Sequence, residues 1–425
     1  MPSKPNTTAT KEEAKPALVP KLRFPEFRGA EAWKSKRLGE LFSDRQESGL
    51  SGLPLLSLMD KEGIVPQEDS NRKNNSNSDK SKYLRVVPGD IAYNTMRMWE
   101  GRSALVGLEG LVSPAYTVCE PRPGVHSLLF SYYFKTPQLI EQFRRFSQGL
   151  VKDTLNLKYP AFAQISAPVP TYPEQQKIAE CLSSVDEVIA AQARKLDALK
   201  THKKGLMQQL FPREGETQPR LRFPEFQNAG AWEPETLENL CSAKISYGIV
   251  QAGPHVPNGM PYIKSTDLNS ELCLANLART SEAIAQKYRR SEVVPGDIVF
   301  SLRGNIGVAQ IVPQSIPVAN LTQGTARIRT KTPPEFFFHA LRSPSVHDQI
   351  LAFGKGSTFQ EISLGALRNV RLFHPKPAEQ HRIATCISSL DALIAAETQK
   401  HAALQRHKRG LMQQLFPSPE ESTEL

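Results

Sequence analysis

The sequence predicts an α+β protein: two mixed α/β domains in a pseudo-twofold tandem repeat, separated by two long antiparallel helices that form a coiled coil. Two observations predict this architecture. Three motifs each occur twice and in the same order, and each copy ends in a long stretch with heptad spacing. A chain of 425 residues also has room for two or three domains rather than one.

The repeated motifs show that the chain is internally duplicated. LRFPEF occurs at 22–27 and 221–226, VVPGDI at 86–91 and 293–298, and GLMQQLFP at 205–212 and 410–417. The intervening segments 50–82 and 246–286 show no such resemblance. The two copies therefore share a frame while their central segments present different surfaces, and a pseudo-twofold protein follows.

Each copy ends in a stretch whose apolar residues recur at four-three spacing, which is typical of a coiled-coil seam. In the first copy the seam residues are Ile178, Leu182, Val185, Ile189, Leu196, Leu199, Leu206 and Leu210. In the second copy they are Ile383, Ile387, Leu390, Ile394, Leu404, Leu411 and Leu415. Helices of about 55 Å with so narrow a stripe should pair with each other. The alternative is that each stripe packs on its own half of the chain.

The helix starts and the repeats divide the chain into six segments. We expect a disordered extension at 1–19, a mixed domain at 20–172, a helix at 173–212, a second mixed domain at 213–376, a second helix at 377–417 and a flexible tail at 418–425. Short β-like runs such as 85–93 and 293–300 should make up the domains. Single helices are expected at 129–146 and 336–353.

The charge of the chain favours a polyanionic partner. The formal net charge is +10, and the two domains share it: 21 Lys and Arg face 16 Asp and Glu over 20–170, and 17 face 12 over 218–376. Equal positive balance is what two phosphate-contacting modules need, although solubility alone could explain a modest excess.

Several classes of protein are disfavoured. No run of eighteen apolar residues indicates a membrane span, the polar start signals no export, and the five cysteines form no CxxC pair, so a reduced, cytoplasmic protein is expected. The GKGS at 354–357 lacks the spacing of a phosphate loop, and neither HExxH nor GxSxG occurs. We therefore expect no catalytic residue, no metal site and no cofactor site in this chain.

Candidate base-reading residues are those that can fork onto base edges, stack or wedge, in loops punctuated by glycine. In the first copy they are Asn94, Arg97, Trp99, Arg102 and Lys152. In the second copy they are Tyr247, Gln251, Lys264, Arg303, Asn305 and Lys355. Any one of them could equally be a solvated surface side chain, so the set carries more weight than its members.

The order of these parts resembles one family. A variable domain precedes PEQQKIAECLSSVDEVI and GLMQQLF, and a second variable domain precedes AEQHRIATCISSLDALI and GLMQQLF. This pattern, over about 21–417, is similar to the specificity subunits of type I restriction-modification systems. Thr332-Pro333-Pro334-Glu335-Phe336 lacks the Asn and the adjacent aromatic residue of the methyltransferase motif of their partner subunits, and we interpret it as a loop.

The resemblance implies a function and partners. The mixed domains would be two target-recognition domains that read the halves of a split, asymmetric site in double-stranded DNA, with the helices setting the gap. Two modification (methyltransferase) subunits that carry S-adenosylmethionine would dock on the frame, and restriction (motor-nuclease) subunits that use ATP and Mg would join them, in the cytoplasm of a bacterium or archaeon. Adenine methylation requires the base to leave the stack, and the pocket for it would belong to the partner.

Two other readings remain open. The chain could be a stand-alone enzyme, against which the missing cofactor and ATP motifs argue. It could also be a coiled-coil DNA-binding scaffold or repressor without modification partners, which would use the same basic domains and helices. Co-purification of a methyltransferase chain would exclude the second reading.

Overall fold

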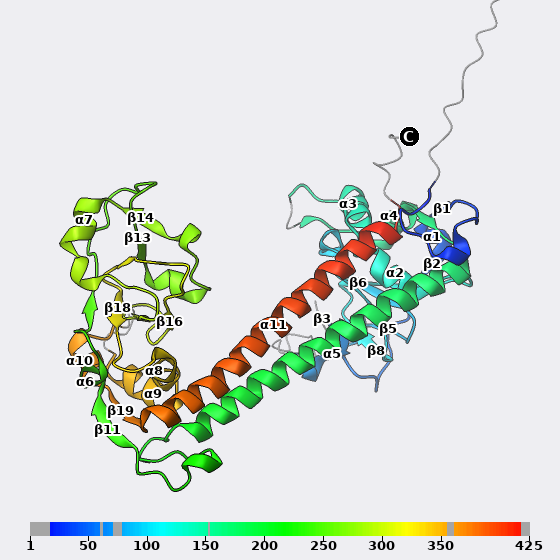
Figure 1. Cartoon of the computed structure of the whole chain (residues 1–425). Helices are drawn as coiled ribbons and strands as arrows, with labels where there is room; N and C mark the ends of the chain where they lie inside the picture. Colours follow the sequence, from blue (N-terminus) through cyan, green and yellow to red (C-terminus); the bar gives the residue numbers. More distant parts are fainter. Residues whose placement is uncertain (1–17, 60–62, 71–78, 152–153, 355–360, 418–425) are drawn as a thin grey trace, which may run out of the picture. The chain divides into compact units, whose positions relative to one another are not determined.

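The chain forms two compact units in a computed structural model that describes residues 18–59, 63–70, 79–151, 154–354 and 361–417. Unit 1 comprises residues 1–192 and 400–425, and unit 2 comprises residues 193–399 (Figure 1). The expected extension at 1–19 and tail at 418–425 fall almost entirely outside the described residues. Each unit therefore contains one mixed domain and one segment of each long helix.

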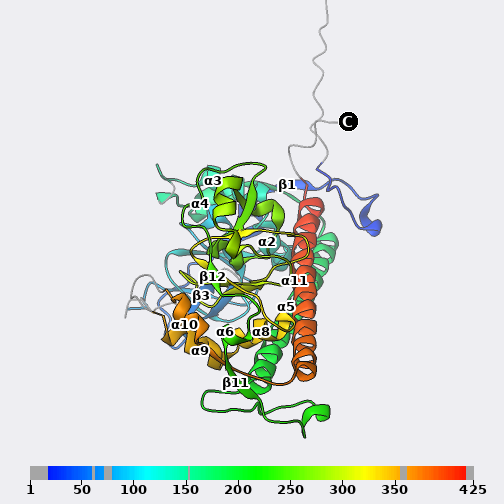
Figure 2. The ribbon, with the colours of Figure 1, turned by 60° about the vertical axis from the view of Figure 1, so that its left-hand side comes forward.

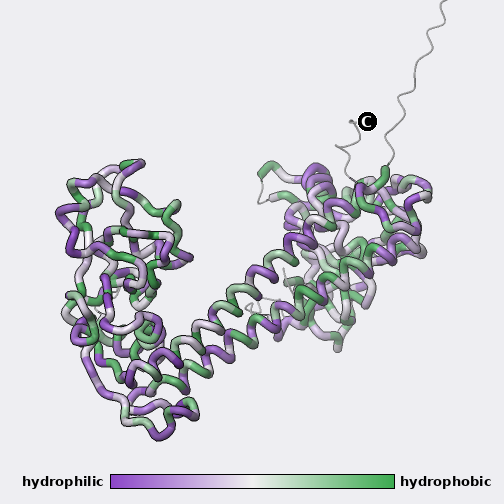
Figure 3. Tube along the Cα trace, in the orientation of Figure 1, coloured by the Kyte–Doolittle hydropathy of each residue, from purple (hydrophilic) through white to green (hydrophobic). Residues whose placement is uncertain are grey.

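The two long helices are α5 (Tyr172–Leu210) and α11 (Pro377–Leu415), each of 39 residues. In unit 2, Lys195 contacts Glu397 and Lys203 contacts Asp391, both at 2.5 Å. Residue numbers therefore rise along α5 as they fall along α11, so the two helices run antiparallel. In unit 1, Lys408 meets Asp186 at 2.6 Å. Within each unit the helix segments lie side by side (Figures 1 and 2), and hydrophilic and hydrophobic residues alternate along them (Figure 3). The predicted antiparallel helices are confirmed.

The mixed domain of unit 1 is built on a four-stranded antiparallel sheet in the order β2-β9-β6-β7. These strands are β2 (Phe42–Asp44), β9 (Tyr116–Pro121), β6 (Ile91–Asn94) and β7 (Ser103–Leu105). Smaller pairs are β1 (Lys34–Arg37) with β10 (Ser166–Val169), β3 (Leu56–Met59) with β4 (Gly63–Pro66), and β5 (Leu84–Val86) with β8 (Gly110–Val112). The α-helices of the domain are α1 (Leu38–Leu41), α2 (Ser127–Tyr133), α3 (Pro137–Phe146) and α4 (Tyr159–Gln164), and its 3-10 turns are η1 (Pro25–Phe27), η2 (Gln67–Asp69) and η3 (Met98–Glu100).

Unit 2 repeats this plan with a sheet in the order β12-β18-β15-β16. Its strands are β12 (Ser246–Tyr247), β18 (Thr325–Ile328), β15 (Ile298–Ser301) and β16 (Ala309–Ile311). Beside it are β14 (Ala278–Thr280), β13 (Met260–Ile263) and β17 (Asn320–Leu321) in one sheet and β11 (Glu233–Thr236) with β19 (Arg371–His374) in another. The helical elements are α6 (Leu237–Leu240), α7 (Glu282–Lys287), α8 (Pro334–Leu341), α9 (Pro344–Ala352), α10 (Leu364–Arg368), η5 (Pro224–Phe226), η6 (Ser265–Asn269), η7 (Leu274–Asn276) and η8 (Arg289–Ser291). The predicted α+β tandem repeat is therefore confirmed.

Each domain packs on the start of its own helix and on the end of the helix from the other repeat. In unit 1, Ile178 and Leu182 of α5 share a core with Leu415 and with Phe416, the residue after α11. The Phe416 ring stacks on Tyr133 with centroids 4.4 Å apart. In unit 2, Phe211, which follows α5, takes the equivalent place beside Trp232 and Phe336. The repeated LMQQLF motif is thus an anchor for the other repeat's domain.

A buried ion pair fastens the LRFPEF segment to each helix start. In unit 1, Arg23 donates two hydrogen bonds of 2.8 Å to the Glu174 carboxylate, and Trp33 Nε1 donates a third of 3.2 Å. In unit 2, Arg222 and Trp232 hold Glu379 in the same way, at 2.5 to 3.3 Å. These glutamates lie in the first turn of their helices, where the helix dipole favours a negative charge. Their carboxylates, however, are engaged by distant residues rather than by the helix dipole alone.

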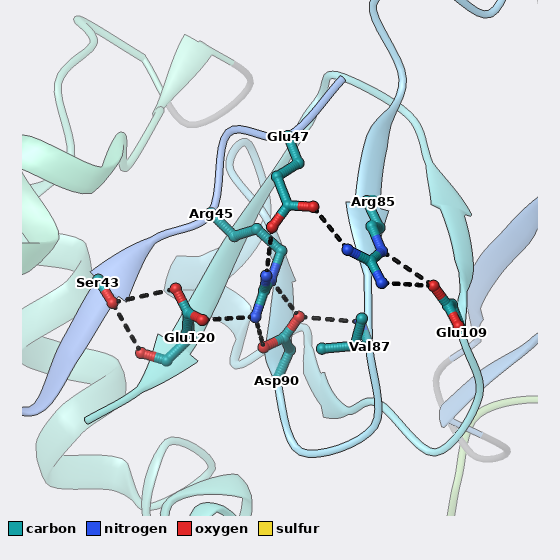
Figure 4. A network of polar contacts seen from close by, with 8 residues as sticks. All are labelled: Ser43, Arg45, Glu47, Arg85, Val87, Asp90, Glu109 and Glu120. Carbon is teal, nitrogen blue, oxygen red and sulfur yellow. Dashed lines mark hydrogen bonds and ion pairs between the residues drawn. The ribbon is translucent and has the colours of Figure 1, made fainter. Parts of the chain in front are cut away.

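The aspartate of each VVPGDI motif forms a second repeated contact, with a cation that follows a different strand in each unit; Figure 4 shows the contact of Asp90 in unit 1. Asp90 accepts from Val87 N–H at 3.0 Å and pairs with Arg45 at 2.9 Å. Asp297 accepts from Val294 N–H at 2.9 Å and pairs with Arg329 at 2.6 Å, so its cation follows β18 rather than β2. Burial nevertheless raises the pKa of Asp90, because desolvation outweighs the Arg45 contact.

Three sequence expectations are corrected by this fold. The segment 332–336, interpreted as a loop, enters α8 at Pro334, because proline suits the first turn of a helix. The helices expected at 129–146 and 336–353 are each two helices, because Pro137 and Pro344 occupy the first turn of α3 and α9 and the residue before proline disfavours helical geometry. The β-like run at 85–93 is likewise divided into β5 and β6 by a turn in which Gly89 has a φ of 100°.

Candidate nucleic-acid interface

Two loops of unit 1 are tied to each other by backbone hydrogen bonds. The first loop, residues 95–102, joins β6 to β7, and the second, described over 147–151 and 154–157, follows α3. The Leu157 N–H donates to the Thr95 carbonyl at 2.9 Å, and Gln148 and Asn156 exchange bonds of 2.9 and 2.8 Å that close the second loop. We call these two segments loop pair 1.

Unit 2 contains equivalent described residues, 302–308 between β15 and β16 and, after α9, 354 and 361–362, which we call loop pair 2. The Ile362 N–H donates to the Leu302 carbonyl at 3.0 Å, and Arg303 forms a β-bridge with Glu361. Both hairpins follow a VVPGDI motif, so the repeated frame places a pair of tied loops at the same position of each domain. Their residues differ between the two units.

The structure brings four of the predicted base-reading residues of unit 1 onto the first loop or its edge. Asn94 Oδ1 accepts from the Met96 N–H and Trp99 Nε1 donates to the Met96 carbonyl, both at 3.0 Å. These two side chains therefore shape the loop from within. Arg97 and Arg102 are the two that extend from it.

Both of these arginines contact one acidic residue. Glu100 accepts Arg97 through its Oε1 atom and Arg102 through its Oε2 atom, each at 3.1 Å. The fifth predicted residue of this unit, Lys152, falls outside the described residues.

In unit 2 the structure places Arg303 and Asn305 on loop pair 2. Arg303 Nε lies 2.8 Å from Glu361 Oε1, and both side chains are nearly half exposed. Asn305 donates to Asn269 Oδ1 at 3.1 Å, which ties the hairpin to η6. Lys355 lies among the residues that the structure does not describe.

Three further predicted residues of unit 2 lie on other elements. Tyr247 is in β12 opposite Ala326, partly buried against the core. Gln251 is exposed after that strand, and Lys264 precedes η6 and pairs with Asp267 at 3.8 Å. These residues lie outside loop pair 2, and their role as base readers stays a prediction.

Sequence reasoning missed the acidic residues that accompany the arginines. Besides Glu100 and Glu361, Glu141 on α3 pairs with Arg144 and Arg145 just before loop pair 1, and these hydrogen bonds lower the pKa of Glu141 to about 2. A count of net charge hides such pairs. The spacing of Glu141 to Arg144 and Arg145, three and four residues along a helix, was the one available signal.

Every predicted seam residue of the long helices is buried or half-buried. The helix ends do not only face another helix, since Ile178, Ile383 and Leu210 belong to the cores of the domains. The apolar stripe therefore packs in part on the other helix and in part on the domains, as the two alternatives predicted. The seam as a continuous apolar contact stays a prediction, because the helix-to-helix contacts named above are ion pairs.

A polar cluster joins each domain to the helix pair. In unit 1, Tyr132 O–H donates to Asp186 at 2.8 Å, and Lys408 of α11 bonds the same carboxylate. In unit 2 the position equivalent to Tyr132 is His339, whose ring lies 3.2 Å from Ser388 Oγ. Burial lowers the pKa of His339 to about 4, so its ring is neutral near pH 7.

Neither a metal cluster nor a membrane span is found in the part of the chain that the structure describes. No group of three His, Cys, Asp or Glu side chains there could hold a metal ion. None of the helices described combines the length and the hydropathy that crossing a bilayer requires.

Comparison with known proteins bears on this arrangement. Residues 230–406 match the family model described as the type I restriction modification DNA specificity domain. The sequence resemblance to type I specificity subunits is confirmed. The chain is 30% identical over 182 residues to the specificity subunit of the type I restriction enzyme EcoBI of Escherichia coli, a match that spans 41% of this chain and 38% of that subunit.

Relatives and solved structures extend this likeness over more of the chain. The MjaVIII specificity subunit of Methanocaldococcus jannaschii is 23% identical over 79% of this chain and 82% of its own length. The fold resembles that of the type I restriction-modification S subunit of M. genitalium, with a TM-score of 0.57 and 14% identity over 94% of this chain and 100% of that one. A chain from a study of assembly and conformational transition of the type I R-M system gives a TM-score of 0.58 and 17% identity over 91% and 98%. The chain shares the fold of these two solved structures.

Proposed function

We propose that this specificity subunit binds DNA through its two loop pairs, each of which reads one half of a bipartite, asymmetric target. The observation that carries the proposal is that two equivalent frames present tied loops at the same position with different residues. Arg97 and Arg102 occupy one hairpin, whereas Arg303 and Asn305 occupy the other. Identical loops would have favoured a palindrome; different ones favour two unlike half-sites.

The chemistry of these loops suits base edges in a groove. An arginine can donate two hydrogen bonds to guanine, and an asparagine can bond both edge atoms of adenine. The hairpins are exposed and belong to basic domains, so phosphate attraction would bring them to DNA and the loop residues would then select a sequence.

The long helices would set the unread gap and dock the modification subunits. Support comes from their 39-residue length and their antiparallel ion pairs. Val188 and Leu393, at equivalent positions of the two helices, are 52% and 41% exposed. Repeated exposed apolar residues fit two copies of one partner.

The chain would direct chemistry that its partners perform. Two methyltransferase subunits would supply S-adenosylmethionine and the pocket for the flipped adenine, and the motor-nuclease subunits would supply the ATP and Mg site for restriction of foreign DNA. This chain would contribute no catalytic residue and no cofactor site of its own. Its place would be the cytoplasm of a bacterium or archaeon, where the DNA to be marked lies.

Single-molecule methylation sequencing tests the proposal. The chain is expressed with its neighbouring modification gene in a methylation-free host, and the modification gene alone is the control. A split, asymmetric adenine motif that appears only with the chain is the expected result. The absence of any new motif, with both proteins folded and associated, would contradict the proposal.

The alternative is a coiled-coil DNA-binding scaffold or repressor without modification partners. The same basic domains and helices would serve it. Purification of the chain from its native cells discriminates the two, because a methyltransferase chain that copurifies in fixed ratio supports only the first function.

A further inference from the structure

A cavity lies beside the hairpin of each loop pair, at equivalent positions of the two domains. In unit 2 it measures about 660 Å³ and lies between residues 304–310 of the hairpin, η6 and α9. In unit 1 it measures about 390 Å³ and lies between residues 100–103, the end of β3, and α3. We call them the hairpin cavities. Each is contained within its own unit.

A basic residue lines both cavities at the same place in the repeat. Lys135 in unit 1 and Arg342 in unit 2 both lie in the turn that separates two helices, one residue before the residue that caps the second helix. The neighbouring lining residues differ, because Ile140 in one cavity stands where His347 stands in the other. A positive charge is therefore kept where the surrounding residues have diverged.

These two cations differ from the arginines of the hairpins. Arg97, Arg102 and Arg303 each have a glutamate partner. Within the described residues, the side chains of Lys135 and Arg342 form no ion pair. An exposed cation without a counter-ion is the one able to accept an anion without first giving up another.

The surroundings of each cation favour an anion. The Arg342 guanidinium lies over the Phe338 ring, 4.8 Å from its centroid, which leaves its N–H edges available for bidentate contact. The pKa of Lys135 is lowered, because nearby protein desolvates the ammonium and Lys408 repels it more than Asp186 attracts it. An anion beside Lys135 would offset both effects.

A glycine in the unit 2 hairpin allows its backbone to approach α9 beside the cavity. Gly307 has a φ of 88°, and a Cβ at this position would lie 2.9 Å from the His347 ring. Any side chain at this position would push the hairpin away from α9, so the glycine permits the close approach of the two. A group held by Arg342 would lie next to the loop that carries Arg303 and Asn305.

We propose that Lys135 and Arg342 each bind one backbone phosphate of the DNA half-site that their own domain reads. This inference rests on the proposed function. It assigns these residues a sequence-independent role, to fix the position of each hairpin over the bases, because phosphate contacts carry register rather than sequence. The hairpin arginines and these two cations would then do separate tasks in the same domain.

The salt dependence of DNA binding tests the proposal. The complex with its modification subunits is titrated by fluorescence anisotropy against a duplex carrying the motif found by methylation sequencing, at several KCl concentrations. The slope of log Kobs against log salt should become shallower by about 0.9 for Lys135→Gln or Arg342→Gln and by about 1.8 for the double variant. Affinity should fall equally for the intact motif and for a duplex with one half-site altered.

Controls separate the failure of this inference from other failures. Arg342→Lys should keep the slope, and Lys36→Gln, exposed on β1 outside the cavity lining, should also keep it. If the wild-type complex binds its motif but Lys135→Gln and Arg342→Gln leave the slope unchanged, the phosphate role is wrong. If these variants lose the modification subunits instead, the cavities receive an acidic protein surface and the proposal is also overturned. Only failure of the wild-type complex to select a motif would count against the proposed function itself.

Discussion

The buried ion pair at the start of α5 makes a quantitative prediction about stability. Replacing Glu174 with Gln removes the carboxylate that Arg23 and Trp33 hold, and the Arg23 and Glu174 side chains are only 6% and 1% exposed. The guanidinium would remain charged in a site without a counter-ion. Removal of one partner of a buried pair costs about 3 to 5 kcal/mol. We expect Glu174→Gln to destabilise unit 1 by that amount.

Hydrogen exchange followed by mass spectrometry resolves this effect from the other unit. The amides at the start of α5 should exchange about 10² to 5 × 10³ times faster in Glu174→Gln, since each factor of ten corresponds to about 1.4 kcal/mol. Glu187→Gln, exposed on the same helix, is the matched control. Arg23→Met combined with Glu174→Leu should recover much of the protection, because no charge is left unpaired. Unchanged exchange in Glu174→Gln would show that the pair does not hold the domain to the helix.

Three other predictions follow from the same structure. The pKa of His339 is lowered to about 4, so its contribution to the stability of unit 2 is complete above about pH 6.5 and is lost as the pH falls toward 4, by up to about 3 kcal/mol. His339→Tyr introduces the residue type of the other repeat and should make the urea midpoint of unfolding less dependent on pH between 7 and 5. Leu196→Asp or Leu404→Asp should disrupt helix pairing and partner docking, since each buries a charge in the seam; unchanged assembly in size-exclusion chromatography would refute the seam. If Arg303 reads a base, Arg303→Ala should lower the discrimination between bases in one half-site by about 1 to 3 kcal/mol, which methylation sequencing would detect as a degenerate position in the motif. Uniform weakening at all positions would indicate a phosphate contact.

The shared frame of the two repeats could be predicted because each of its motifs occurs twice in the sequence. The repeated motifs located both helices and both domains, and their order required a tandem architecture. The partners of Glu174 could not be predicted, since Arg23 lies 151 residues away along the chain. A glutamate in a first turn already had a local explanation in the helix dipole, and nothing in the spacing indicated a second one.

Two prolines in the sequence indicated that each expected helix is divided in two, but the apolar spacing favoured one continuous helix. Pro137 and Pro344 each follow a residue that proline moves out of the helical region, and the apolar pattern continues across both breaks. The two breaks matter for the proposed phosphate contacts, because the turns created there carry Lys135 and Arg342. The sequence correctly placed the hairpin arginines in loops, but it did not indicate the turns that carry these two cations.

Under the proposed function, the acidic partners of the hairpin arginines would order each hairpin without preventing its contact with DNA. An exposed ion pair contributes about 0.2 to 1 kcal/mol, whereas a bidentate contact to the correct base discriminates by about 1 to 3 kcal/mol. Glu100 and Glu361 can therefore hold Arg97, Arg102 and Arg303 in place in free protein and still be displaced by guanine. At a base that offers no matching acceptors, the arginine gains less than it gives up, and the glutamate keeps it. On this argument the two glutamates favour selectivity over affinity, and Glu100→Gln should tighten binding to unrelated DNA more than binding to the target.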